Sequence, residues 1–128
     1  MPARGIDRLQ LGRDAEAAAA MFLQSQQLCI LTRNYRCRTG ELDIVARTAD
    51  GIVVIAEVRL RNSCSYGGGA ASVDFRKQRK IERATRHLLA THPELARCAL
   101  RFDVLDLKPG VGGFDINWIR HAFNVSGR

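Results

Sequence analysis

Two neighbouring stretches of the chain, residues 41–47 and 52–60, predict a β-hairpin with a carboxylate on each strand. Apolar residues recur at every second position in both stretches, which is typical of strands that bury one face. The connection between them ends in Gly51, which favours a three-residue loop with glycine at its left-handed position. With that loop, Asp43 on the first strand lies opposite Glu57 on the second.

The opposition of Asp43 and Glu57 needs a compensating cation. Side chains across a strand pair lie about 4.5–5.5 Å apart at Cβ, where like charges destabilise the sheet. A hard divalent cation bound by carboxylate oxygens would offset this repulsion. The backbone carbonyl of Val58 could add a further oxygen, and Glu16 on a preceding helix could approach the same point. We therefore predict a Mg²⁺ or Mn²⁺ site with Asp43, Glu57 and Val58 as ligands and Glu16 as an auxiliary ligand.

A structural role for the same residues is left open. Asp43 and Glu57 could be exposed sheet carboxylates that Arg59 and Arg61 balance. The predicted register also sets Glu41 opposite Arg59, so these two side chains could simply form a cross-strand ion pair.

The rest of the chain predicts helices on either side of the hairpin, and further strands. Apolar spacing and β-forming residues indicate helices over residues 7–26 and 73–91 and strands over residues 28–36, 99–107 and 116–123. A mobile glycine-rich loop is expected over residues 62–71, and a turn-rich break over residues 109–113. We predict one α/β domain over residues 1–128, with a mixed sheet of four or five strands flanked by helices.

The balance of charge favours an anionic polymer as partner. Twenty Lys and Arg against thirteen Asp and Glu give a net charge of +7 and a pI near 9.9. Basic residues crowd the second predicted helix, where we expect nucleic-acid contacts from Arg76, Lys77, Lys80 and Arg83. A solvated helical face is the alternative. No stretch approaches the roughly 18 apolar residues of a membrane span, and the N-terminus lacks a continuous apolar segment, so we expect a cytoplasmic protein without a membrane partner.

Motifs along nearly the whole chain follow one another in a recognisable order. They are Gly12-Arg13-Asp14-Ala15-Glu16 with Ala19 and Leu23, Leu31-Thr32-Arg33-Asn34-Tyr35-Arg36, Gly40-Glu41-Leu42-Asp43, Glu57-Val58-Arg59-Leu60-Arg61, Tyr66-Gly67, Lys77, Arg101-Phe102-Asp103-Val104 and His121-Ala122-Phe123. A helix with Glu, a strand with Asp and Glu-x-basic on the next strand together resemble the PD-(D/E)xK nuclease superfamily. More narrowly, the chain resembles the YraN family of small bacterial predicted endonucleases, which are distantly related to archaeal Holliday junction resolvases.

The resemblance implies a restriction-endonuclease-like fold and metal-dependent cleavage of structured DNA, with Asp43, Glu57, Arg59 and Glu16 as the catalytic residues. One residue departs from the family pattern, which has lysine where this chain has Arg59. Arginine keeps a positive charge but cannot take a proton near neutral pH. A nucleic-acid-binding protein of the same fold with impaired cleavage is therefore one alternative, and a small protein-interaction module is another. A homodimer is left open. Lys77 or Lys80 could reach into the site from the basic helix.

Overall fold

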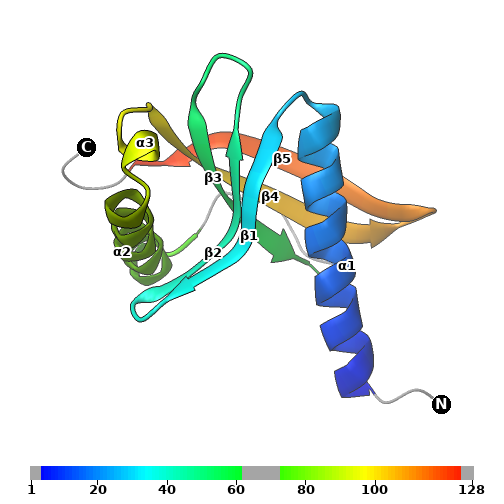
Figure 1. Ribbon diagram of the computed structural model, residues 1–128. Helices are drawn as coiled ribbons and strands as arrows, with labels where there is room; N and C mark the ends of the chain where they lie inside the picture. Colours follow the sequence, from blue (N-terminus) through cyan, green and yellow to red (C-terminus); the bar gives the residue numbers. More distant parts are fainter. Residues whose placement is uncertain (1–3, 62–72, 125–128) are drawn as a thin grey trace.

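The computed structural model describes residues 4–61 and 73–124, with side chains from residue 9 onward (Figure 1). The predicted loop over residues 62–71 lies outside the described residues. In chain order the elements are α1 (Arg4–Ser25), β1 (Cys29–Cys37), β2 (Gly40–Arg47), β3 (Val53–Leu60), α2 (Phe75–Thr91), α3 (Pro93–Ala96), β4 (Leu100–Gly110) and β5 (Gly113–Phe123). None of the helices in these ranges is both long and apolar enough to cross a membrane.

The five strands form one mixed sheet in the order β1-β2-β3-β4-β5. Neighbouring strands are antiparallel except β3 and β4, which are parallel. Parallel neighbours need a crossover connection, and α2 and α3 lie between these two strands in the chain. Figure 1 shows α1 and α2 on opposite sides of the sheet. The predicted fold class, a mixed α/β sheet flanked by helices, is confirmed.

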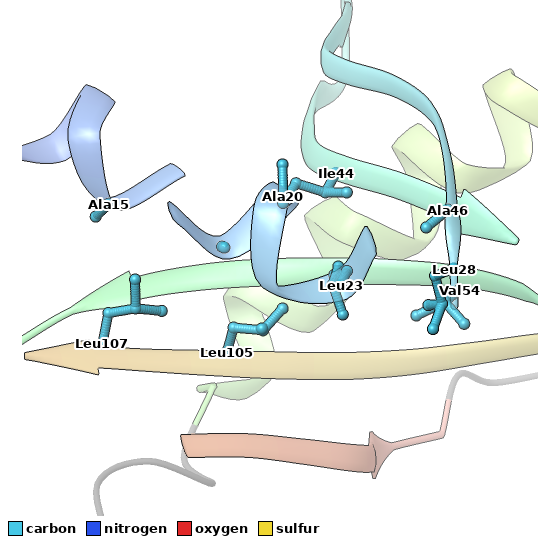
Figure 2. Close-up of a cluster of buried hydrophobic side chains, with 11 residues drawn as sticks. Ala15, Ala20, Leu23, Leu28, Ile44, Ala46, Val54, Leu105 and Leu107 are labelled. Atoms are coloured by element: carbon cyan, nitrogen blue, oxygen red, sulfur yellow. The ribbon is translucent and has the colours of Figure 1, made fainter. Parts of the chain in front are cut away.

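Each face of the sheet is buried by a different helix. On one face of the sheet, small side chains of α1 form much of the contact: Ala15, Ala20 and Leu23 belong to the same buried cluster as strand side chains such as Val54 and Leu105 (Figure 2). Small side chains allow a helix to lie close to a sheet, which brings α1 near the strand backbones. The opposite core is formed by α2 and the alternate positions of the same strands. Side chains of β3 therefore reach both helices.

The hairpin of β2 and β3 has the predicted register. The N–H of Thr48 donates to the carbonyl of Ile52 at 2.9 Å, and Gly51 adopts a φ of +94°, which favours glycine. Paired residues run as far as Ile44 opposite Ala56. The regular pairing ends there, one position before Asp43 and Glu57, which the loop length predicted to lie opposite each other.

A buried carboxylate, Asp103 on β4, accepts hydrogen bonds from the edge strand β5. Its oxygens accept hydrogen bonds from Nε and Nη2 of Arg101, both at 2.9 Å, from Nε1 of Trp118 at 2.9 Å and from the backbone N–H of His121 at 3.0 Å. The pairing of β4 with β5 shifts at this point, and His121 has a φ of +56°. Asp103 thus satisfies a backbone donor that the irregular ladder leaves available.

Most predicted boundaries differ from the structure by one to three residues, and the short helix α3 was not predicted; two of the differences have a clear local cause. The break predicted over residues 109–113 narrows to a tight turn, because β4 continues to Gly110 and β5 begins opposite it at Gly113. Gly112 has a φ of +80°, so glycine permits a hairpin where the sequence indicated a longer interruption. The second helix begins at Phe75 rather than near residue 73, since the Asp74 side chain caps it by accepting from the N–H of Lys77 at 2.8 Å.

Candidate functional site

Asp43 and Glu57 meet where the paired part of the β2–β3 hairpin ends. Oδ2 of Asp43 accepts the backbone N–H of Val58 at 2.9 Å, so this carboxylate completes the hydrogen bonding of β3. The charge of Asp43 raises the pKa of Glu57, as expected for two neighbouring carboxylates. The structure therefore brings together the two carboxylates that the register predicted. Val58 takes part through its N–H, and its role as a carbonyl ligand stays a prediction.

Burial raises the pKa of both carboxylates of this pair. Burial, with the charge of Asp43 as the next cause, raises the pKa of Glu57 to about 7. Burial also raises the pKa of Asp43, although the N–H of Val58 and the Glu57 side chain act in the opposite direction. At neutral pH this pair holds less negative charge than two free carboxylates, and a nearby cation would favour its ionised form.

Lys77 of α2 supplies such a cation. Its Nζ lies 3.2 Å from Oε2 of Glu57. Lys77 precedes Ile81, Ala84 and Leu88 on the buried stripe of α2, which packs against the sheet. Burial alone would lower the pKa of Lys77, but Glu57 and then Asp43 raise it, so the side chain stays an ammonium group. Of the predicted nucleic-acid contacts, Lys77 thus faces the carboxylates instead of the outer surface.

Glu16 approaches the carboxylate pair from α1, on the other side of the sheet. Burial and the charge of Asp43 raise the pKa of Glu16. Its carboxylate is hydrogen-bonded to the Asn34 side chain and lies 3.8 Å from Nη2 of Arg33. Among the described side chains, no three Asp, Glu, His or Cys residues gather closely enough to enclose a metal ion. The charge of Asp43 therefore acts on Glu16, and direct ligation of a metal by Glu16 stays a prediction.

Arg59 lies half-buried on β3, two residues beyond Glu57 and on the same face of the strand. Its register neighbour on β4 is Asp106, whose Oδ1 accepts Nε of Arg61 at 2.8 Å. Glu41, the cross-strand partner considered for Arg59, forms an ion pair of 3.3 Å with Arg36 on β1. The positive charge found beside the carboxylates is that of Lys77, and the role of Arg59 in the site stays a prediction.

The carboxylates fit a hard divalent cation. Mg²⁺ commonly takes one or two carboxylates from a protein and keeps several water molecules. Asp43 and Glu57 supply that number of carboxylates. Burial disfavours their ionised forms, and a bound cation would stabilise those forms. Sequence reasoning missed Asn34 as a partner of Glu16. The φ of +54° at Asn34 reflects a local strand irregularity that residue patterns do not reveal.

The remaining predicted nucleic-acid contacts, Arg76, Lys80 and Arg83, lie together on the outer side of α2. They line a shallow hollow whose other lining residues are Asp74, Phe75 and Arg79. Phe75, Arg76, Arg79, Lys80 and Arg83 are all exposed. This outer face therefore concentrates positive charge, while Lys77 extends from the same helix to Glu57.

The raised pKa of Glu57 predicts that this carboxylate destabilises the metal-free protein above neutral pH. The unfolded chain releases the Glu57 proton near 4.5, whereas the folded protein holds it to about 7. The contribution of Glu57 to the free energy of unfolding is therefore fully present below about pH 4.5, and it is lost as the pH rises through 7. Glu57→Gln should raise the free energy of unfolding by about 1–3 kcal/mol at pH 8 and change it little at pH 4.5. Urea unfolding with a chelator present measures the difference. Equal destabilisation at both pH values would contradict it.

Comparison with known proteins places these features in a family. The profile of the uncharacterised protein family UPF0102 matches residues 15–107. A UPF0102 protein of Nitrosomonas europaea is 48% identical over 115 residues, covering 90% of this chain and 94% of that protein. A UPF0102 protein of Cupriavidus metallidurans is 43% identical over 126 residues, covering 98% and 90% of the two chains.

A distant structural likeness was also found. Pyrococcus furiosus SfsA in complex with Ca²⁺ has a TM-score of 0.31 and 11% identity, over 92% of this chain and 65% of that one. A score this low carries no argument about this chain. The family profile and the identities decide the assignment. The chain belongs to the uncharacterised protein family UPF0102, the YraN-type family that the sequence motifs indicated.

Proposed function

We propose that this protein is a metal-dependent endonuclease acting on structured DNA. The observation that carries the proposal is the pair of half-buried Asp43 and buried Glu57, with the ammonium of Lys77 3.2 Å from Glu57. Structural ion pairs rarely combine two adjacent, largely buried carboxylates with one lysine, because the repulsion and the desolvation both cost stability. Such an arrangement is typical of a site that is maintained for chemistry.

The residues of the site divide into ligands and charge-stabilising groups. Asp43, Glu57 and the carbonyl of Val58 would hold Mg²⁺ or Mn²⁺, with Glu16 as an auxiliary ligand. The metal would supply an activated water near neutral pH and would neutralise charge on the phosphodiester. Lys77 positions Glu57 and places a positive charge where negative charge develops on the phosphate. Arg59 adds a second positive charge but cannot accept a proton.

The outer face of α2 supports DNA as the substrate class. Arg76, Lys80 and Arg83 are exposed, and they lie on the helix that also carries Lys77. Lysine and arginine side chains on such a face would contact phosphates and displace counterions, which gives binding independent of sequence. The net charge of +7 would assist the approach of a polyanion.

A second candidate follows from Arg59. If cleavage in this family requires the lysine found at that position, this chain binds DNA without cutting it efficiently. Lys77 favours retained activity, because it brings a lysine ammonium to Glu57 from a different element. The two candidates therefore differ in whether Lys77 can take over the electrostatic role of the motif lysine.

Cleavage of branched and linear DNA with Mg²⁺ or Mn²⁺ tests both candidates. We expect weak cleavage by the natural protein and a rate about 10-fold or more higher for Arg59→Lys. Lys77→Met should reduce cleavage about 100-fold while DNA affinity changes little, because its charge faces Glu57. Lys108→Met, an exposed position on β4, is the matched control.

The outcomes separate the candidates. DNA binding without cleavage in the natural protein and in Arg59→Lys would favour the binding protein. Efficient natural cleavage that falls in Arg59→Lys would make arginine the better catalytic residue. Unchanged cleavage in Lys77→Met would remove the role given to Lys77.

A further inference from the structure

We propose that the hollow on the outer side of α2 binds an unpaired nucleotide of DNA, with its base stacked on Phe75. The inference rests on the proposed DNA-directed function and names the substrate class more narrowly, as DNA with an unpaired nucleotide beside a duplex. It starts from the exposure of Phe75, whose side chain is 67% exposed. The other aromatic residues within the described ranges are buried or half-buried.

The position of Phe75 on α2 explains why it does not join the core. The buried stripe of the helix contains Ile81, Ala84 and Leu88. Phe75 lies two residues before Lys77, so its side chain projects from a different side of the helix. A single exposed apolar residue is common on protein surfaces and would mean little alone. Its surroundings distinguish this one.

Phe75 is surrounded by positive charge. Arg76, Arg79, Lys80 and Arg83 line the same hollow, and Cζ of Arg79 lies 5.7 Å from the centre of the Phe75 ring. Asp74 is the one carboxylate of the lining, and its Oδ1 is occupied by the N–H of Lys77. The hollow thus offers an aromatic face within a strongly cationic surface.

This combination matches the chemistry of a nucleotide. A nucleotide presents an anionic phosphate beside an aromatic base, and proteins that bind single strands join basic grooves to aromatic stacking surfaces. Paired bases in a duplex are stacked on each other and cannot reach a side chain without being extruded. Phe75 should therefore select an unpaired nucleotide, as found in a flap, an overhang or a branched junction. An acidic peptide would match the charge but would not need an aromatic face.

The hollow and the carboxylate site share one turn of α2. Phe75 and Lys77 lie within that turn, about 3 Å apart along the helix axis, but their side chains project from different sides of the helix. Lys77 reaches Glu57 from that turn. A strand bound at Phe75 would therefore have to follow the surface of α2 towards the sheet to bring a phosphate to Asp43 and Glu57.

The test uses the full chain and DNA carrying 2-aminopurine at an unpaired position next to a duplex. Fluorescence of 2-aminopurine falls when the base stacks, and anisotropy of a second label reports affinity. A blunt duplex of equal length is measured in parallel. EDTA prevents metal-dependent cleavage during both measurements. The variants are Phe75→Leu, which keeps an apolar side chain without an aromatic face, and Phe75→Trp, which keeps the face.

We expect the natural protein and Phe75→Trp to quench 2-aminopurine and to bind the flap more tightly than the blunt duplex. Phe75→Leu should lose the quenching and bind the flap about 5- to 100-fold more weakly, with duplex affinity unchanged. Met21→Ala, at a 69% exposed apolar position on α1, is the control and should behave as the natural protein.

The result that overturns this inference is distinct from the result that overturns the proposed function. Quenching and flap affinity that persist in Phe75→Leu would reject stacking on Phe75 while leaving DNA binding intact. A triple replacement of Arg76, Lys80 and Arg83 with alanine should flatten the dependence of duplex affinity on salt, by about 0.9 per lost phosphate contact on logarithmic axes. Absence of duplex binding by the natural protein at low salt would reject DNA as the substrate and this inference with it.

Discussion

Replacing Asp103 with alanine should lower the free energy of unfolding by about 3–5 kcal/mol, because it leaves the partners of a buried carboxylate without an acceptor. The Arg101 side chain is 17% exposed and would lose both hydrogen bonds to this carboxylate. Trp118 and the N–H of His121 would lose theirs. The midpoint of thermal unfolding should fall by about 10–20 °C.

Two further variants separate the buried network from an effect of charge alone. Asp115→Ala removes an exposed carboxylate on β5 and should change stability by no more than about 0.5 kcal/mol. Asp103→Leu combined with Arg101→Met should recover much of the loss, since it removes the unpaired guanidinium as well. A loss below 1 kcal/mol in Asp103→Ala would show that water replaces the carboxylate.

Asp43→Asn should reduce metal-dependent DNA cleavage by at least about 100-fold and should weaken Mn²⁺ binding by a similar factor. The amide removes one of the two carboxylates proposed to hold the cation. Its oxygen can still accept the N–H of Val58, so the end of the hairpin should remain intact. Isothermal titration with Mn²⁺ and cleavage assays measure the two losses, and urea unfolding confirms the fold.

Glu41→Gln is the matched control for Asp43→Asn. Glu41 is an exposed carboxylate on the same strand that forms an ion pair with Arg36, and its charge is the smallest of the causes that act on the pKa of Asp43. Its replacement should leave cleavage within about twofold of the natural protein, as expected for a solvent-screened charge. Full activity in Asp43→Asn would remove Asp43 from the proposed site and, with it, the metal-dependent mechanism.

Local signals were sufficient to predict the carboxylate pair. The register of β2 and β3 depends on loop length and on a glycine at the left-handed position, and Gly51 adopts the expected conformation. The period of two holds from Ile44 onward but fails at Asp43, since Leu42 lies in the core under α2 while Ile44 and Ala46 lie in the core under α1. The class of fold followed in the same way from helical and strand periods along the chain.

Features that depend on packing between distant segments were beyond local reasoning. The contact of Lys77 with Glu57 depends on how α2 lies on the sheet, although its spacing from Ile81, Ala84 and Leu88 was a usable signal. One partner of Asp103, the backbone N–H of His121, lies at an irregularity in the pairing of β4 and β5 that no residue pattern indicated. Sequence reasoning placed Lys77 with the DNA-contacting cations and also allowed that Lys77 or Lys80 could reach the site, and the structure brings Lys77 to Glu57.

The hydrogen bond from Val58 to Asp43 makes the strand end and the candidate site depend on the same oxygen. Most side chains of a catalytic site can be exchanged without altering the main-chain hydrogen bonds of the scaffold. Here the Asp43 carboxylate also accepts a main-chain N–H of β3. Alanine at this position would remove both this hydrogen bond and the proposed metal ligand, whereas asparagine would remove only the charged ligand. Evolution of a non-cleaving descendant should therefore pass through asparagine more readily than through an apolar residue.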